Sequence, residues 1–221
     1  ADRGTILGAM EDLREEIDEE DRLLIFYAGH GQIDQATLIA AIIGNPAKVY
    51  DATTGATLTS TNYSLTGFIG AEGATVTQTV GSYDSANAGA RTVTASLGAG
   101  DFTAIGSTQL SNYILPTNAS GAGAIDQKSL TAVIIGDPTR VYDATTVAAL
   151  TSANYQLTGF VGTEGATVTE TAGVYDSANA GARTVTATLT GADFTADGGT
   201  LLSNYILPTG AAGAGHIAQA T

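Results

Sequence analysis

The chain has 221 residues with no cysteine, no tryptophan and a formal charge of −14 at pH 7. The missing cysteine excludes disulfide scaffolds, cysteine-ligated metal sites and cysteine nucleophiles from this chain. Eight Lys and Arg against 22 Asp and Glu also argue against nucleic acid or an anionic membrane as partner, because little positive charge is present to neutralise phosphates. No apolar run approaches eighteen residues, so membrane insertion is not expected.

Residues 1–31 differ in pattern from the rest of the chain. Apolar residues at helical spacing over residues 6–17, with acidic residues on the other face, predict an amphipathic helix. The apolar run over residues 23–27 then predicts a buried strand. The acidic residues 11–21 lack the spacing of a calcium loop and are interpreted as a solvated helix face. We therefore expect a short helix-plus-strand segment ahead of the main fold.

From residue 32 onward the chain is an internal repeat. Val49-Tyr50-Asp51-Ala52-Thr53-Thr54 returns 92 residues later as Val141-Tyr142-Asp143-Ala144-Thr145-Thr146, and about seven positions in ten are identical between the copies. This pattern predicts one module over residues 32–123 and a second over 124–215, with 216–221 as the start of a next repeat or a tail. The Ala/Gly/Ser-rich stretches 117–123 and 209–215 predict short, semi-flexible connectors.

Within each module the local pattern is typical of β structure. Period-two alternation and β-branched residues, bounded by Gly, Asn and Pro, predict short strands with frequent turns. In the first module the expected strands are residues 37–43, 56–60, 63–69, 74–80, 91–97 and 112–115. The expected fold is all-β, with two tandem Ig-like or β-grasp-like modules. The expected core is made of six recurring aromatic positions, namely Tyr50, Tyr63, Phe68, Tyr83, Phe102 and Tyr113, repeated as Tyr142, Tyr155, Phe160, Tyr175, Phe194 and Tyr205.

Four separated motifs of the repeat resemble a known family. They are Val-Tyr-Asp-Ala-Thr-Thr from residue 49, Tyr-x-Leu-Thr-Gly-Phe from residue 63, Tyr-Asp-Ser-Ala-Asn-Ala-Gly from residue 83 and Ser-Asn-Tyr-Ile-Leu-Pro from residue 111. In this fixed order they resemble the YDG-type repeat of very large bacterial surface and secreted proteins similar to filamentous haemagglutinin. The sequence departs from the pattern where Ala52 and Ala144 replace the glycine of the naming tripeptide.

The resemblance implies a stalk or spacer module at the cell surface of a bacterium or outside it. It implies no active site and no cofactor, so the chain is not expected to be an enzyme. The expected partners are neighbouring repeats of a longer array.

A second, local resemblance concerns the first segment. The string Tyr27-Ala28-Gly29-His30-Gly31, after an apolar strand, is similar to the stretch of caspase-like cysteine peptidases that ends at the catalytic histidine. On that resemblance His30 would be the general base, which requires a thiolate to activate. This chain has no cysteine, so a fragment of such a peptidase lacking its nucleophile is kept only as an alternative.

Several polar residues are candidates for sites. The repeated aspartates Asp51, Asp84, Asp101, Asp143, Asp176 and Asp193 are weak calcium candidates, and turn capping is the favoured interpretation. Lys48 is replaced by Arg140 in the second module, so it is interpreted as a surface charge rather than as part of an isopeptide bond. Arg91 and Arg183 are expected to pair with Asp84 and Asp176. A third functional alternative is a fibre module that assembles through the N-terminal segment or through its sheet edges.

Overall fold

The computed structural model describes residues 35–221. The expected N-terminal helix, the expected strand and His30 lie outside the described residues. Within them, both repeats form β modules, and the prediction of an all-β fold with two tandem modules is confirmed.

Module 1, residues 35–126, contains eleven strands and three single turns of 3-10 helix. In chain order these elements are β1 (Ala36–Thr37), β2 (Ile39–Ile42), β3 (Ala47–Val49), β4 (Gly55–Thr57), η1 (Ser60–Asn62), β5 (Tyr63–Thr66), β6 (Gly73–Val76), β7 (Val80–Tyr83), β8 (Gly89–Ser96), η2 (Ala99–Asp101), β9 (Phe102–Ile105), η3 (Leu110–Asn112), β10 (Tyr113–Ile114) and β11 (Asn118–Asp126).

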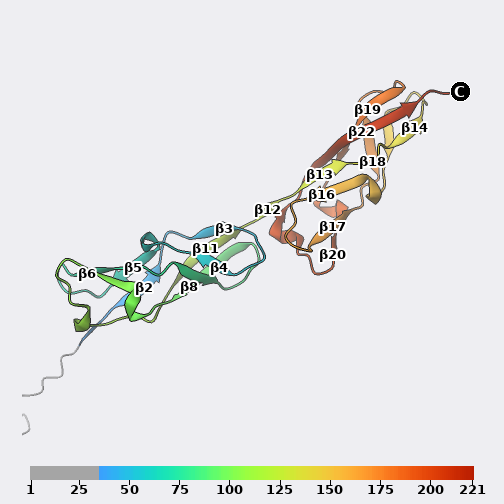
Figure 1. The fold of residues 1–221 in the computed structure, drawn as a ribbon. Coiled ribbons are helices and arrows are strands. Elements are labelled where there is room, and N and C mark those ends of the chain that lie inside the picture. Colours follow the sequence, from blue (N-terminus) through green and yellow to red (C-terminus); the bar gives the residue numbers. More distant parts are fainter. Residues whose placement is uncertain (1–34) are drawn as a thin grey trace, which may run out of the picture. The chain divides into compact units, whose positions relative to one another are not determined.

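One mixed sheet organises module 1. Its order is β4-β7-β8-β11-β2-β5, and β3 also pairs with β11 (Figure 1). Strand β11 is antiparallel to β8 on one side, while on the other side it is parallel first to β2 and then to β3. The pairs β1–β10 and β6–β9 form two small accessory sheets. The last strand of the module is therefore central to its main sheet.

Module 2 repeats this arrangement strand for strand. Its elements are β12 (Lys128–Ser129), β13 (Thr131–Ile134), β14 (Thr139–Val141), β15 (Val147–Ala149), η4 (Ser152–Asn154), β16 (Tyr155–Thr158), β17 (Gly165–Val168), β18 (Ala172–Tyr175), β19 (Gly181–Thr188), η5 (Gly191–Asp193), β20 (Phe194–Asp197), η6 (Leu202–Asn204), β21 (Tyr205–Ile206) and β22 (Gly210–Ala218). The sheet order is β15-β18-β19-β22-β13-β16, with β14 pairing to β22.

The prediction of semi-flexible connectors between the modules is wrong. Residues 117–123 and 209–215 are not flexible linkers, because they form most of the central strands β11 and β22. Their small side chains have a packing reason: Ala119 is fully buried, and a Cβ on Gly123 would lie 2.9 Å from the Pro46 carbonyl oxygen and 3.0 Å from the Tyr83 ring. Module 1 therefore ends structurally at Asp126, three residues beyond the expected boundary.

Other strand predictions differ in their ends. The expected strand 63–69 stops at Thr66, where Gly67 adopts a φ of 102° that β structure does not allow. The expected strand 74–80 is divided between β6 and β7, which belong to different sheets.

Most of the expected core residues lie inside the modules. Nine are buried, namely Tyr50, Tyr63, Tyr83, Phe102, Tyr113, Tyr155, Tyr175, Phe194 and Tyr205. Phe68 and Phe160 are half-buried, and Phe68 packs edge-on against Tyr113 at a centroid distance of 5.2 Å. Tyr142 is wrongly assigned to the core, because it is 41% exposed whereas its counterpart Tyr50 is 4% exposed. The difference arises from the neighbouring module, as described below.

The alanine that replaces the motif glycine sits in the left-handed region of backbone conformation. The φ angles of Ala52 and Ala144 are 62° and 63°. Because a Cβ is unfavourable there, Ala52→Gly and Ala144→Gly should each raise the free energy of unfolding by about 0.5–1 kcal/mol. Urea unfolding followed by circular dichroism measures the change.

The matched controls for this prediction are Ala104→Gly and Ala196→Gly, at exposed positions of β9 and β20. There glycine adds only chain entropy to the unfolded state, so each control should lose about 0.5–1 kcal/mol. Equal losses at all four positions would contradict the proposed strain.

Candidate functional site

The most elaborate side-chain arrangement of residues 35–221 lies at the junction between the modules. Tyr50, just after β3 of module 1, packs edge-on against Tyr205 of module 2 with ring centroids 5.4 Å apart and planes at 80°. Tyr205 in turn packs against Phe160 at 5.0 Å. Leu130 and Tyr205 of module 2 belong to the same apolar cluster as the core of module 1. The core of module 1 thus continues into module 2.

Both tyrosine hydroxyls of the junction donate hydrogen bonds to the same carboxylate. The Tyr50 hydroxyl donates to Glu164 Oε1 at 2.6 Å, and the Tyr205 hydroxyl donates to the other oxygen of Glu164. The Tyr205 oxygen also accepts a hydrogen bond from the Val161 amide at 3.0 Å. Hydrogen bonds to a charged acceptor are among the stronger ones, so Glu164 fixes the two rings relative to each other.

An asparagine completes the polar contacts between the modules. Asn204 is 1% exposed, and its Oδ1 accepts a hydrogen bond from the Ala88 amide at 2.9 Å. Its Nδ2 donates to Asn87 Oδ1 at 3.2 Å. Both ends of the buried amide are therefore satisfied by the loop that precedes β8, which removes the cost of burying it.

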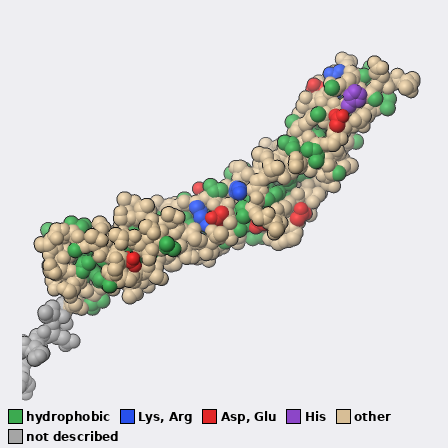
Figure 2. Space-filling view, in the orientation of Figure 1, with side chains coloured by type: hydrophobic (Ala, Val, Ile, Leu, Met, Phe, Trp, Pro, Cys, Tyr) green, Lys and Arg blue, Asp and Glu red, His purple; other side chains and the backbone are tan. Residues whose placement is uncertain are grey.

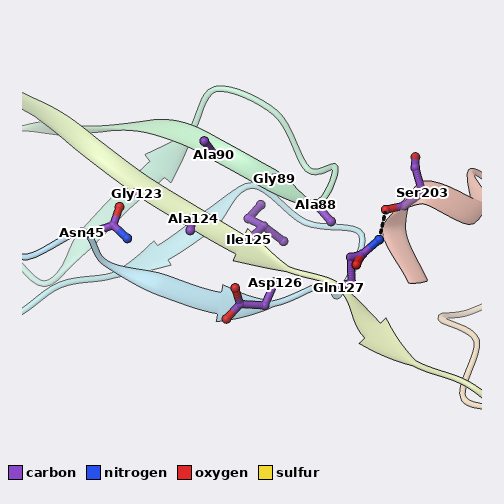
Figure 3. A pocket seen from close by; sticks show the side chains of 10 residues that line it. All are labelled: Asn45, Ala88, Gly89, Ala90, Gly123, Ala124, Ile125, Asp126, Gln127 and Ser203. Carbon is purple, nitrogen blue, oxygen red and sulfur yellow. Dashed lines mark hydrogen bonds between the residues drawn. The ribbon is translucent and has the colours of Figure 1, made fainter. Parts of the chain in front are cut away.

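Only one residue, Gln127, separates the last strand of module 1 from the first strand of module 2. Its side-chain amide donates to the carbonyl oxygens of Ser203 at 2.9 Å and Tyr205 at 3.2 Å. Figure 3 shows Gln127 reaching Ser203 at a recess of about 430 Å³, which is lined mostly by residues of module 1, including Ala88 and Asp126, and also by Gln127 and by Ser203 of module 2. The connection between the modules is therefore anchored rather than loose.

Burial and the shared carboxylate alter the acidity of the junction tyrosines. Burial, and then the hydrogen bond to Glu164, raise the pKa of Tyr205 to about 12. The same two causes raise the pKa of Tyr50 above its usual value. Both phenols therefore keep their protons, and their donated hydrogen bonds, beyond the pH at which an exposed tyrosine ionises.

This shift predicts a loss of stability in alkali. A tyrosine of the unfolded chain ionises near pH 10, so between about pH 10 and 12 the unfolded state releases its proton first and the free energy of unfolding falls as the pH rises. Tyr205→Phe should reduce that fall. Urea unfolding of both proteins at pH 9 and pH 11 measures it, and an equal alkaline loss in the two proteins would contradict the role of Tyr205.

The candidate aspartates make local hydrogen bonds at turns. Oδ1 of Asp51 accepts from the Thr53 amide at 2.9 Å, and Asp143 repeats this contact with Thr145 at the same distance. The remaining four accept from backbone amides: Asp84 from Thr92, Asp101 from Gly98, Asp176 from Thr184 and Asp193 from Thr190. Within residues 35–221, no three Asp, Glu or His side chains are grouped so that they could hold a metal ion.

The expected pairing of Arg91 with Asp84 is wrong. The Arg91 guanidinium instead donates to the carbonyl oxygens of Asn87 at 2.7 Å and Ala88 at 2.9 Å, and Arg183 does the same in module 2. Arg91 thereby shapes the loop whose Ala88 amide contacts module 2, and Arg183 shapes the equivalent loop of module 2.

Lys48, in β3 two residues before Tyr50, forms an ion pair with Asp51 at 2.7 Å. Arg140 forms the corresponding pair with Asp143. Charged side chains are few on the face of the molecule drawn in Figure 2. No helix in the described part of the chain is both long and apolar enough to cross a membrane.

Two successive β modules with the same strand order define a tandem-repeat protein. The sequence pattern of the YDG domain matches residues 34–120 and again residues 126–212, and the chain belongs to the YDG domain family. Comparisons with the curated proteins and with the solved structures gave no significant match.

Sequence reasoning did not identify the polar residues of the junction. Glu164, Asn204 and Gln127 all have counterparts in the other repeat, namely Glu72, Asn112 and Gln35. Repeated polar residues outside the turn motifs are therefore the signal that could have pointed to them.

Proposed function

We propose that the chain is a spacer: part of a stalk in a large bacterial surface or secreted protein of the filamentous haemagglutinin-like kind. The observation that carries this proposal is the one-residue connection between β11 and β12, together with the side-chain contacts on either side of it. Domains joined by small polar interfaces move freely by default, whereas an apolar interface with anchored polar groups restrains them. A spacer needs such restraint in order to hold what it carries at a set distance.

The proposal assigns no catalysis to the chain. The caspase-like resemblance of residues 1–31 requires a cysteine partner for His30, and the sequence contains none. Assembly through sheet edges has little support, because the outer strands β4 and β5 have three and four residues and offer few unpaired backbone groups. The same reasoning applies to module 2.

Distance measurement between the modules tests the spacer proposal. Thr57 and Ala149 are exposed and occupy equivalent places in β4 and β15. Since the chain has no cysteine, Thr57→Cys and Ala149→Cys permit specific spin labelling. Electron double resonance should give a single narrow distance distribution, whereas a broad distribution, as from two beads on a string, would overturn the proposal.

A separate measurement tests the cellular location. Antibodies against residues 35–221 should label intact cells of the source bacterium or detect the protein in its culture medium. Labelling only after the cells are made permeable would contradict a surface or secreted location.

A further inference from the structure

The end of module 2 that corresponds to the junction side of module 1 carries the same residues. We call this end the distal face and define it by Tyr142, Asn179, Ala180 and Gln219. They are the counterparts of Tyr50, Asn87, Ala88 and Gln127, the residues through which module 1 contacts or joins module 2.

The backbone under the distal face is already in the geometry of the junction. The Tyr50 amide donates to the Asp126 carbonyl at 2.8 Å, and the Tyr142 amide donates to the Ala218 carbonyl at 2.8 Å. Arg183 holds the carbonyls of the Asn179 and Ala180 loop as Arg91 holds those of its own loop. The distal face therefore needs no rearrangement to present the same groups.

The junction face of module 1 and the distal face differ in how far another module buries them. The exposed fraction of the tyrosine rises from 4% at Tyr50 to 41% at Tyr142. Asn179 is exposed, whereas Asn87 is half-buried. The junction recess also recurs on the distal face, with a volume of about 340 Å³, but without a serine of another module at its edge.

We propose that the distal face binds the N-terminal end of a further YDG module that follows in the same chain. The required partner groups are those that module 2 presents to module 1: a glutamate to accept the Tyr142 hydroxyl, an aromatic ring against which Tyr142 packs, and an asparagine to bond the Ala180 amide. Gln219 follows β22 with the spacing of Gln127 after β11, so it is placed to be the single residue that connects module 2 to that further module. This inference rests on the proposed spacer function and names its repeating contact.

The physical logic is that of other repeat proteins. Each unit contributes its own stability and an interface term with its neighbour, and the same interface is reused at every step. A head-to-tail contact between unlike faces leaves one unlike face free at each end of an open array, so the same contact can be repeated as further modules are added. The junction of this chain is one such step, and the distal face offers the next.

A chain extended by its own module tests the proposal. Residues 1–218 followed by a second copy of residues 127–221 place a third module on the distal face with the natural one-residue connection. Amide hydrogen exchange at Ala180 should slow at least tenfold relative to the 221-residue chain, because the amide gains an asparagine acceptor. Exchange at Ala88, which is already bonded to Asn204, should stay unchanged and serves as the internal reference.

Two variants test whether individual side chains form the proposed contact. In the extended chain, Tyr142→Ala should lower the melting temperature about as much as Tyr50→Ala does in the 221-residue chain, while in the 221-residue chain it should have little effect. Asn204→Ala in the appended copy should restore fast exchange at Ala180, because it removes the acceptor of that amide.

Unchanged exchange at Ala180 in the extended chain would overturn the proposal. A third module that stays unfolded would do the same, since a matching face should stabilise it. Either result leaves the spin-label distance within the original chain unaffected, so failure of this inference and failure of the spacer proposal are distinguishable.

Discussion

Gly121→Ala should lower the free energy of unfolding of module 1 by about 3 kcal/mol or more. Gly121 lies in the central strand β11 beside β2, and a Cβ there would overlap the carbonyl group of Ile42, with the Ile42 Cβ also only 3.1 Å away. Backbone atoms of a paired strand cannot move aside as a flexible side chain can, so the cost lies at or above the upper end of that for overpacked cores. Gly213→Ala should have the same effect on module 2, where the carbonyl of Ile134 takes the place of Ile42.

The measurement is urea unfolding combined with hydrogen exchange, which reports each module separately. Gly100→Ala and Gly191→Ala are the matched controls, because a Cβ at either position meets nothing within 4 Å. The controls should leave the free energy of unfolding within about 0.5 kcal/mol of the original protein. A Gly121→Ala protein as stable as its control would show that β2 can move away from β11.

The second large effect is expected at the junction. Tyr50→Ala should cost about 3–5 kcal/mol, because it removes a buried ring from the contact with Tyr205 and leaves Glu164 with one phenol fewer. Tyr142→Ala should cost less than about 1 kcal/mol, since the same residue in the same local sequence is 41% exposed. The pair therefore separates the contribution of the neighbouring module from that of the tyrosine's own module.

Hydrogen exchange locates the change. In Tyr50→Ala, the Ala88 amide should exchange faster, because its acceptor Asn204 belongs to the other side of the loosened contact. Strand β8 of module 1 should keep most of its protection. Equal costs for Tyr50→Ala and Tyr142→Ala would contradict a junction that depends on side-chain packing.

The sequence alone was sufficient for the repeat, its 92-residue offset and the all-β class. These features depend on local patterns: period-two alternation, turn residues and identical motifs at a constant spacing. The family resemblance, carried by the same motifs, is confirmed for residues 34–120 and 126–212.

The sequence pattern did not predict strand β11, for a physical reason. A run of Ala, Gly and Ser has the composition of a linker, and it lacks the β-branched residues that mark most strands. Only the tertiary structure shows that β8 pairs with this run on one side and β2 and β3 on the other, so closely that larger side chains do not fit.

The contacts of the junction likewise depend on distance in space rather than in sequence. Tyr50 and Glu164 are 114 residues apart, and no local pattern connects them. Tyr50 and Tyr142 have the same neighbours in the sequence and the same backbone hydrogen bond, yet one is buried and the other is exposed. The sequence determined what each module is, and the tertiary structure decided which of its two equivalent tyrosines is covered, because burial depends on the module that packs against it.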